Sequence, residues 1–401
     1  MSKKKSNIFY DICRGIFPTE SNVNLKCESL STIAKKHRLI YPLLKYNKDL
    51  RINNLSWEDV KKIENIKQQH LKELITNFSL LKINFMLIKG IALKKYYPHN
   101  VPRQSIDYDF IIKTIEDFFV VYNYLKELGY EYEGFPLFSE VEGKIYGIVK
   151  MEKDLGNGLI SKLEFNVGGF LISEVTWLDE DILFDNSEYF ELNDTMVLIP
   201  NSTMNYIILV IEVGGNPYDR IRDSVDYFFL RESINTPKAQ ELINKYNLKS
   251  FEKRLLTAYK LIEQNKFNNN KPKSLLNDIK VRLLKDQHIL PYLIKNRTFN
   301  FKFLFNYYMV VLGNYLIYKK ASLTFIKKID NLVLTINRFR SGILTNFVPI
   351  NDNRINKWKE KKLRKNLIIY RNPFGTFFLS NFCVHEQEEI DFLEKSTGSL
   401  L

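Results

Sequence analysis

Apolar residues in the first 80 positions recur mainly at helical spacing. Ser56 offers an N-cap for a helix, and Asp59 stands at the capping-box position three residues later. The apolar stripe that follows consists of Val60, Ile63, Ile66, Leu74 and Phe78, with His70 on the same face. Two shorter stripes precede it, formed by Ile8, Ile12, Ile16 and Phe17 and by Leu39, Leu43 and Leu44. Residues 1–79 are therefore predicted to be an N-terminal helical segment, with His70 as a core or boundary residue.

From residue 83 onward, apolar runs of strand length alternate with segments of helical period. Residues 83–88 and 106–112 are such runs, whereas residues 91–97 and 115–128 have apolar positions at helical spacing. Pro98 ends the first of these helices, and Gly129 stands where a C′ glycine ends the second. The order is strand, glycine turn, helix, polar loop, strand and helix, which predicts one coherent α/β unit.

Residues 130–198 favour further strands. Residues 145–151 and 159–167 are β-like, and the turn between them contains Asn157-Gly158, a common hairpin signal. In the second of these strands the side chain of Glu164 alternates with those of Leu163 and Phe165, so it lies on the opposite face. Residues 195–199 predict one more short strand.

After residue 201 the pattern is predominantly helical. The predicted helices cover residues 204–213, 221–230, 238–246, 250–264, 274–284, 301–319 and 323–339. The predicted fold class is therefore mixed α/β (α+β), with a mixed sheet, N-terminal helices and a helical C-terminal domain. The predicted domain boundaries are 1–79, 80–235 for the central core, and 236–401.

The composition is that of an ordinary soluble globular protein, with 45% hydrophobic and 26% charged residues. The net charge of +13 suits an anionic partner such as a nucleotide, a nucleic acid or an acidic peptide. The same charge could also be spread evenly over the surface of a Lys- and Asn-rich chain. The basic stretch 357–365 could track nucleic acid, with Trp358 stacking on a base, but Glu360 interrupts it and favours a solvated helix face.

Cysteine and histidine usage gives no sign of a disulfide framework or a zinc site. Cys13, Cys27 and Cys383 are far apart, and the five histidines show no paired metal spacing. The basic N-terminus is not followed by a secretory apolar segment, and the most apolar later stretch, 303–318, is too short for a typical membrane span. We therefore expect a cytoplasmic protein.

The most informative chemical feature is a pair of carboxylates in the second apolar run. Asp107 and Asp109 stand two positions apart, so a strand would project both from one face. Two like charges ~4 Å apart repel by about 4 kcal/mol at an effective dielectric constant of ~20. A buried pair therefore shares a proton or holds cations, and Mg²⁺ suits carboxylate oxygens. The alternative is a strand with a hydrated acidic face.

The residues around this pair add an ordered set of features: an apolar run ending at Lys89-Gly90, then Tyr97-Pro98, Arg103, Ser105, Asp107-Tyr108-Asp109, and a helix ending in Leu128-Gly129-Tyr130. This set resembles the signature of a bacterial, largely uncharacterised nucleotidyltransferase family of the DNA polymerase β superfamily. The resemblance covers roughly residues 80–230. Residues 163–166 and 221–226 are similar to later segments of the family, an acidic-hydrophobic-His segment and a helix that carries an Asp.

The resemblance implies a polymerase-β-like core that transfers a nucleoside monophosphate from an NTP, with ATP favoured, to an acceptor hydroxyl and releases pyrophosphate. Asp107, Asp109 and Glu164 would hold two Mg²⁺ ions, and Glu164 could also take the acceptor's proton. The implied nucleotide-binding residues are Lys89, Gly90, Arg103 and Ser105. A hydroxyl of a small molecule, peptide or protein is expected as acceptor in preference to a nucleic-acid end.

This sequence departs from the family pattern at two positions. Gly90 is followed by Ile91, so the first turn offers no hydroxyl, and Asn166 stands where relatives often have His. Asp223 and Asp226 are expected to pair with Arg220 or Arg222 on their own helix. For Arg103, the alternatives to a phosphate contact are an exposed loop residue or a salt bridge to Asp107.

Two hypotheses from other classes stay open at this point. One is a nucleic-acid-binding module that retains a degenerate nucleotidyltransferase fold, which would bind oligonucleotides in a salt-dependent way without turnover. The other is an antitoxin-like interaction protein in which the acidic strand is structural. Kinase-like phosphoryl transfer is a chemical variant of the leading hypothesis.

Overall fold

A computed structural model describes residues 6–13 and most of 27–266, together with 346–350, 367–372 and 375–380. Within the second range, residues 48, 53, 134–136, 142–143, 157, 174–175, 193, 217–219 and 265 are not described. The chain divides into two compact units. The first consists of Met1–Asp109 with Asp181–Asn277, and the second of Phe110–Glu180 with Asp278–Leu401.

The first unit begins with four helices: α1 (Ser6–Cys13), α2 (Cys27–Lys36), α3 (Ile40–Tyr46) and α4 (Trp57–Leu80). The predicted capping box at the start of α4 is confirmed. The Ser56 side chain accepts from the Asp59 amide, and the Asp59 carboxylate accepts from the Ser56 amide. On the predicted stripe Val60, Leu74 and Phe78 are buried, whereas Ile66 is exposed because it lies at the margin of the face. His70 is partly buried and faces Glu73, as expected of a boundary residue.

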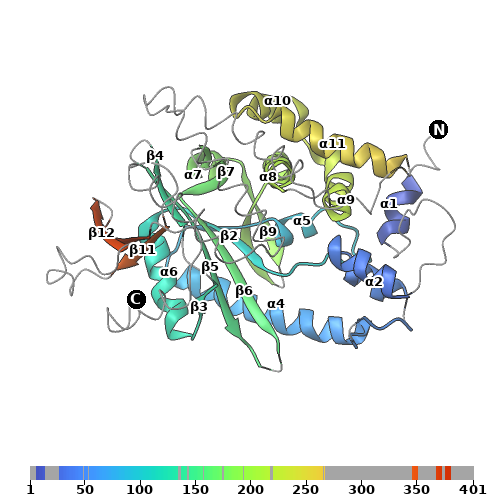
Figure 1. Ribbon diagram of the computed structural model, residues 1–401, viewed down its shortest axis with the longest axis horizontal. Helices are drawn as coiled ribbons and strands as arrows, with labels where there is room; N and C mark the ends of the chain where they lie inside the picture. Colours follow the sequence, from blue (N-terminus) through green and yellow to red (C-terminus); the bar gives the residue numbers. More distant parts are fainter. Residues whose placement is uncertain are drawn as a thin grey trace, which may run out of the picture. The chain divides into compact units, whose positions relative to one another are not determined.

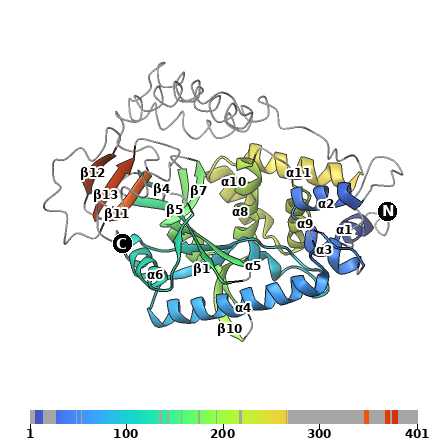
Figure 2. The same ribbon diagram turned by 60° about the horizontal axis from the view of Figure 1, so that its bottom comes forward.

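The same unit contains a strand, a turn and a short helix next to α4 in the sequence, namely β1 (Phe85–Ile88) and α5 (Gly90–Lys94). Later in the chain come α7 (Glu180–Asp185) and the hairpin of β9 (Ser187–Leu192) and β10 (Thr195–Pro200). Strand β10 packs against β1, and α4 runs beside β10 (Figure 2). The predicted strands at 83–88 and 195–199 are therefore confirmed.

The helical part of this unit consists of α8 (Ser202–Gly215), α9 (Ile221–Leu230), the 3-10 turn η1 (Arg231–Ser233), α10 (Thr236–Lys245) and α11 (Lys249–Glu263). Helix α8 is apolar on nearly all sides and is buried by α9, α10 and α11, which run beside it (Figure 1). The predicted helices at 204–213, 221–230, 238–246 and 250–264 are confirmed.

The N-terminal helices share one hydrophobic core with the later helices of the unit. Phe9 of α1 stacks on Phe228 and on Tyr259, with ring centroids 4.7 and 4.9 Å apart. Buried side chains of α1, α2, α3, α4, α9 and α11 belong to the same cluster. This core packs α9 against the loop that carries Val101. The same packing brings Asp226 of α9 next to Arg103, two residues after Val101.

The described part of the second unit contains the helix α6 (Ile115–Glu127), one large sheet and two smaller sheets. The strands of the large sheet in this unit are the end of β2 (Tyr108–Ile112), β3 (Glu131–Tyr132), β4 (Leu137–Val141), β5 (Lys144–Asp154) and β6 (Ile160–Val167). A separate hairpin is made by β7 (Gly169–Ser173) and β8 (Thr176–Asp179). Strands β5 and β6 form the predicted long antiparallel hairpin, which crosses the centre of Figure 1.

The predicted end of α6 and the predicted alternation of side chains along β6 are both confirmed. Gly129 follows α6 with a φ of +82°, and the amide of Tyr130 donates to the carbonyl of Leu125, which closes a Schellman-type end. Strand β6 alternates, with Ser161, Leu163 and Phe165 buried and Glu164 only partly buried on the other face. The largest sheet has the order β1-β2-β6-β5-β3, with β4 also paired to β5. A mixed α/β fold is thus confirmed.

The C-terminal part differs from the prediction. Strands β11 (Asn346–Ile350), β12 (Leu367–Asn372) and β13 (Gly375–Ser380) form a three-stranded antiparallel sheet. The predicted helical C-terminal domain over residues 236–401 therefore also contains strands, which the prediction did not include. Short apolar runs between polar residues, such as Leu367–Asn372, suit a strand as well as a helix turn, and pairing decides between them. The predicted helices 274–284, 301–319 and 323–339 lie outside the described residues, and the predicted domain boundaries stay predictions.

Among the helices that the structure describes, none has the length and hydropathy needed to cross a lipid bilayer.

Candidate metal and nucleotide site

The acidic pair lies at the start of a fully buried strand. All five residues of β2 are buried, and Asp109 is the one carboxylate among them, with 5% of its surface exposed. Asp107 precedes the strand in a bend, rather than lying inside it as the prediction had it. The Ser105 hydroxyl donates to the carbonyl oxygen of Asp107 at 3.1 Å and so fixes this bend. Ser105 therefore acts on the backbone next to the acidic pair.

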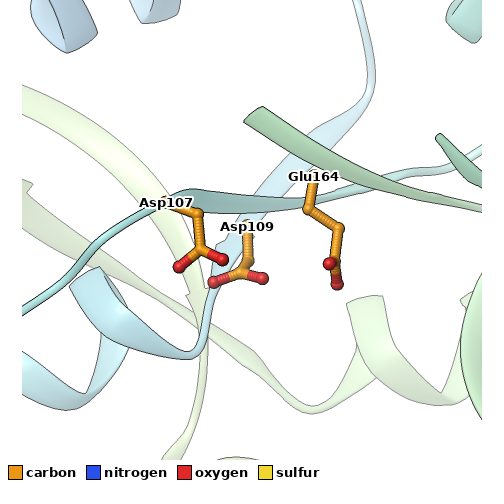
Figure 3. Close-up of side chains that lie close together, drawn as sticks. All are labelled: Asp107, Asp109 and Glu164. Atoms are coloured by element: carbon orange, nitrogen blue, oxygen red, sulfur yellow. The ribbon is translucent and has the colours of Figure 1, made fainter. Parts of the chain in front are cut away.

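Three carboxylates come together here. One carboxylate oxygen from each of Asp107, Asp109 and Glu164 lies within 4.8 Å of the others. Figure 3 shows the Asp107 and Asp109 carboxylates next to each other, with the Glu164 side chain extending in the same direction from a neighbouring strand. The three residues that the sequence singled out as an acidic set thus form one cluster. Such a cluster of oxygen donors fits the ligand preference of Mg²⁺.

Glu164 has a cationic neighbour on the paired strand. In the β5–β6 register it lies opposite Lys150, and the lysine Nζ is 3.0 Å from Glu164 Oε2. The next cross-strand pair on the same face joins Glu152 and Lys162. Lys150 is about half exposed, so its charge is well solvated and the pair contributes little to stability. Glu164 is therefore paired with a solvated cation, whose place a metal ion could take.

Lys89 is positioned by the turn between β1 and α5. Its Nζ lies 3.0 Å from Asp109 Oδ1 and 3.2 Å from Glu212 Oε1. Its backbone has a φ of +53°, a conformation that L-residues adopt only at a cost. The predicted phosphate-binding lysine thus sits beside the acidic cluster, with a carboxylate on either side of its ammonium group.

Gly90 allows a close approach within the protein itself. A Cβ at this position would lie 2.0 Å from the Ser105 Oγ and 3.4 Å from Arg103 Nη1. The sequence predicts that the absence of a side chain at Gly90 lets a phosphate approach the backbone, and that role stays a prediction. In the structure, the space over Gly90 is filled by the Ser105 side chain, so any larger residue would displace the bend before Asp107.

Arg103 is buried and paired in a way that the sequence did not indicate. Its Nε and Nη2 donate to the two carboxylate oxygens of Asp226, both at 2.8 Å, and its Nη1 donates to the Gly90 carbonyl at 3.1 Å. Burial opposes its charge, but Asp226 holds the pKa of Arg103 above its ordinary value. The two alternatives considered for Arg103, an exposed loop residue or a bridge to Asp107, are both wrong. A phosphate contact stays a prediction, while the observed contacts tie the Lys89-Gly90 turn to α9.

Asp226 and Asp223 have different partners. Asp223 pairs with Arg220 at 2.8 Å, as expected for residues on one helix, whereas the short contacts of Asp226 are with Arg103 and with the Tyr97 hydroxyl at 2.5 Å. Arg222 lies farther from Asp226, at 3.8 Å. Burial favours the neutral form of Asp226, but the charge and hydrogen bonds of Arg103 hold its pKa below the ordinary value. Asp226 therefore remains charged in the interior.

Two ionisable residues lie near the cluster although the sequence did not indicate them as site residues. Glu212, which contacts Lys89, is the one charged residue within the apolar helix α8, and this isolation could have indicated it. Lys67 of α4 has its Nζ 3.5 Å from the carbonyl oxygen of Ile106. Burial lowers the pKa of Lys67, while the charges of Glu64 and Asp107 act in the opposite direction. Lys67 is one of many lysines on a polar helix face, so the sequence offers no signal for it.

Asn166, at the position where the family pattern often has His, is buried on β6. The basic stretch 357–365 lies outside the described residues, so its proposed contact with nucleic acid stays untested.

Comparison with known proteins supplies the remaining evidence. No curated protein matches the chain. A crystal structure of an antigenic nucleotidyltransferase-like protein from Paracoccidioides brasiliensis aligns with 47% of this chain and 92% of its own, at 15% identity and a TM-score of 0.27. The sequence profile of a family described as "Uncharacterised nucleotidyltransferase" matches residues 28–264, a span that holds every residue of the acidic cluster. Since this match covers more than half of the chain, the protein belongs to this family of uncharacterised nucleotidyltransferases.

Proposed function

We propose that this nucleotidyltransferase moves a nucleoside monophosphate from an NTP, with ATP favoured, to a hydroxyl group of a small molecule, peptide or protein. The observation that carries the proposal is the meeting of three carboxylates, Asp107, Asp109 and Glu164, within 4.8 Å. Family membership makes the protein a transferase that uses a nucleotide, and it gives no support to kinase-like phosphoryl transfer. The cytoplasmic location stays a prediction.

The donor set fits a divalent cation. Asp107, Asp109 and Glu164 offer only oxygen ligands and would hold Mg²⁺, for which carboxylates are suitable partners. A bound ion would polarise the phosphoryl group and lower the pKa of a coordinated oxygen. Asp109 is buried at the strand start and cannot move freely, so it would act as the fixed ligand of the set.

The residues of the chain would then share the chemical work. The acceptor oxygen forms a bond to the α-phosphorus, the bond from the α-phosphorus to the bridging oxygen breaks, and pyrophosphate leaves. Glu164 accepts the proton of the acceptor hydroxyl. Lys89 offers its charge to the phosphates, and Gly90, Arg103 and Ser105 hold the turn that carries Lys89.

The test is transfer of α-labelled nucleotide. Purified protein is incubated with each α-labelled NTP, Mg²⁺ and a lysate that supplies acceptors, and the label that becomes attached to an acceptor is followed over time. We expect Asp109→Asn to lower the rate on the order of 10²–10⁴-fold, because several kcal/mol of transition-state stabilisation would be lost. Asp185→Asn, a matched change at an exposed carboxylate at the end of α7, should leave the rate unchanged.

Several results would count against the proposal. Equal labelling by wild type and Asp109→Asn would refute the metal-site assignment. Label from γ-labelled but not α-labelled ATP would indicate phosphoryl transfer. Salt-dependent oligonucleotide binding without turnover would favour the nucleic-acid-binding module, and co-purification with a partner but no Mg²⁺–NTP binding would favour the antitoxin-like protein.

A further inference from the structure

The Lys89 ammonium group lies between two carboxylates of the same compact unit. Asp109 Oδ1 is 3.0 Å away and Glu212 Oε1 is 3.2 Å away. Asp109 belongs to the acidic cluster, whereas Glu212 comes from α8. The lysine side chain is largely buried, so water screens these contacts only in part. One cation thus neutralises a proposed metal ligand and a carboxylate outside the cluster at the same time.

The backbone conformation of Lys89 is unusual for a residue with a side chain. Lys89 has a φ of +53° and a ψ of −111°, a region in which glycine would be unstrained. The neighbouring Gly90 does not relieve this strain, because its own role is to make space for Ser105. A lysine that is held in a costly conformation between two carboxylates is a candidate for a functional group.

Glu212 has a second cationic neighbour besides Lys89. Its other oxygen, Oε2, lies 3.8 Å from Arg220 Nη2, and Arg220 donates from Nε to Asp223 at 2.8 Å. Burial opposes the charge of Arg220, but Asp223 and Glu212 raise its pKa above the ordinary value. Glu212 is the one charged residue on α8, and its two carboxylate oxygens face two cationic side chains, Lys89 and Arg220.

A metal ion at the acidic cluster would compete with Lys89. Carboxylate oxygens that coordinate a divalent cation cannot also accept from an ammonium group along the same direction, and two cations this close repel each other. Lys89 would then need another anionic partner nearby. Glu212 already lies within contact distance of the same ammonium group, so it is available as that partner.

We propose that Lys89 is a built-in counter-ion of the metal site, and that Glu212 is a positioning residue that takes over Lys89 when a divalent cation binds Asp109. This inference rests on the proposed metal site. In the metal-free protein Lys89 neutralises Asp109 and keeps the acidic residues compatible with folding. After exchange, Glu212 holds the lysine beside the cluster, where it can meet the phosphates of a nucleotide.

The test measures Mn²⁺ affinity of the metal-free full-length protein by calorimetry or by the EPR signal of free Mn²⁺, without nucleotide. Lys89→Met removes the competitor, so the dissociation constant should fall, by about 3–10-fold. Glu212→Gln leaves Lys89 with Asp109, so the dissociation constant should rise by about the same factor. Lys238→Met and Glu241→Gln, a matched exposed pair on α10 at 3.0 Å, should change nothing.

The double variant Lys89→Met, Glu212→Gln shows whether Glu212 affects Mn²⁺ binding by holding Lys89 or only through its own negative charge. If Glu212 acts through Lys89, Glu212→Gln should have no effect on Mn²⁺ affinity once Lys89 is methionine. If Glu212 only contributes negative potential, Glu212→Gln should weaken Mn²⁺ binding whether residue 89 is lysine or methionine, and that result would overturn the inference. Far-UV circular dichroism and the melting temperature establish that each variant is folded, and Lys89→Arg, which keeps the charge, should bind Mn²⁺ more weakly than Lys89→Met.

The outcomes also distinguish this inference from the proposed function. No Mn²⁺ binding by wild type would overturn both. Loss of Mn²⁺ binding in Asp109→Asn would support the metal site. If Lys89→Met then bound Mn²⁺ more weakly than wild type, only the proposed transfer of Lys89 from Asp109 to Glu212 would be overturned.

Discussion

The ion pair between Arg103 and Asp226 offers the most direct test of how the turn before the acidic cluster is held. Arg103→Met removes a guanidinium whose side chain is only 3% exposed and which makes two 2.8 Å hydrogen bonds to Asp226. It also removes the 3.1 Å hydrogen bond to the Gly90 carbonyl. The variant leaves a charged carboxylate in the interior, with Tyr97 and the more distant Arg222 as its nearest partners.

The expected cost follows from that burial. Breaking a buried ion pair by removing one partner costs about 3–5 kcal/mol, because the remaining charge loses its compensation. Replacing both partners of a buried ion pair by apolar residues often leaves the free energy of unfolding nearly unchanged. In this protein the double replacement would leave the Tyr97 hydroxyl without its acceptor, which costs about 1–3 kcal/mol. We therefore expect Arg103→Met combined with Asp226→Leu to be more stable than Arg103→Met alone.

The assay is urea unfolding followed by tryptophan fluorescence and circular dichroism, with the free energy of unfolding taken from the midpoint and slope of the transition.

Stability should also depend on pH through Asp226. Its pKa is lowered in the folded protein, so its contribution is present above the ordinary carboxyl pKa of about 4 and is lost as the pH falls through the lower folded value. Asp226→Asn should flatten the acid limb of the stability curve relative to wild type.

Two results would refute this reasoning. A loss below about 1 kcal/mol in Arg103→Met would mean that the carboxylate is not effectively buried. A double variant as unstable as the sum of the two single variants would mean that the residues do not act as a pair.

Two further predictions concern neighbouring groups. Gly90→Ala would bring a Cβ within 2.0 Å of the Ser105 Oγ, so it should cost about 1–3 kcal/mol in urea unfolding, and Ser105→Ala should restore most of that loss. If Ser105→Ala restored no stability, the loss in Gly90→Ala would come from the backbone of the turn and not from contact with the Ser105 side chain. Burial, with a smaller effect of Asp226, raises the pKa of Cys13 to about 12. At pH 8 it should therefore hold about 10³-fold less thiolate than an ordinary cysteine, and iodoacetamide should label its peptide only after unfolding. Rapid labelling in the native protein would contradict the burial of α1.

The sequence predicted those features that depend on residues close together in the chain. Ser56 and Asp59 define the start of α4 because a capping box needs only four residues. Gly129 ends α6 because a positive φ at that position suits glycine. The β5–β6 hairpin and the alternation along β6 follow from turn chemistry and the two-residue period of a strand. Leu367–Asn372 shows the limit of this reasoning, since a short apolar run becomes a strand only when another strand pairs with it.

The candidate site divides in the same way. The ordered motif around Asp107 and Asp109 identified the acidic pair, and the alternation of β6 suggested Glu164 as its third member. The identity of the partners of Lys89 and Arg103 could not be predicted, because complementary charge is available at many positions of a chain with 59 basic and 46 acidic residues.

By itself, the sequence determined several of the strands and helices, the start of α4, the end of α6 and the acidic residues, because periodicity, capping and motif spacing act over a few positions. Only the tertiary structure decided that Arg103 is paired with Asp226, 123 residues away, and that Glu212 of α8 meets Lys89. The physical reason is that a buried charge selects its partner by desolvation and proximity in the folded core, and neither quantity exists until the helices have packed.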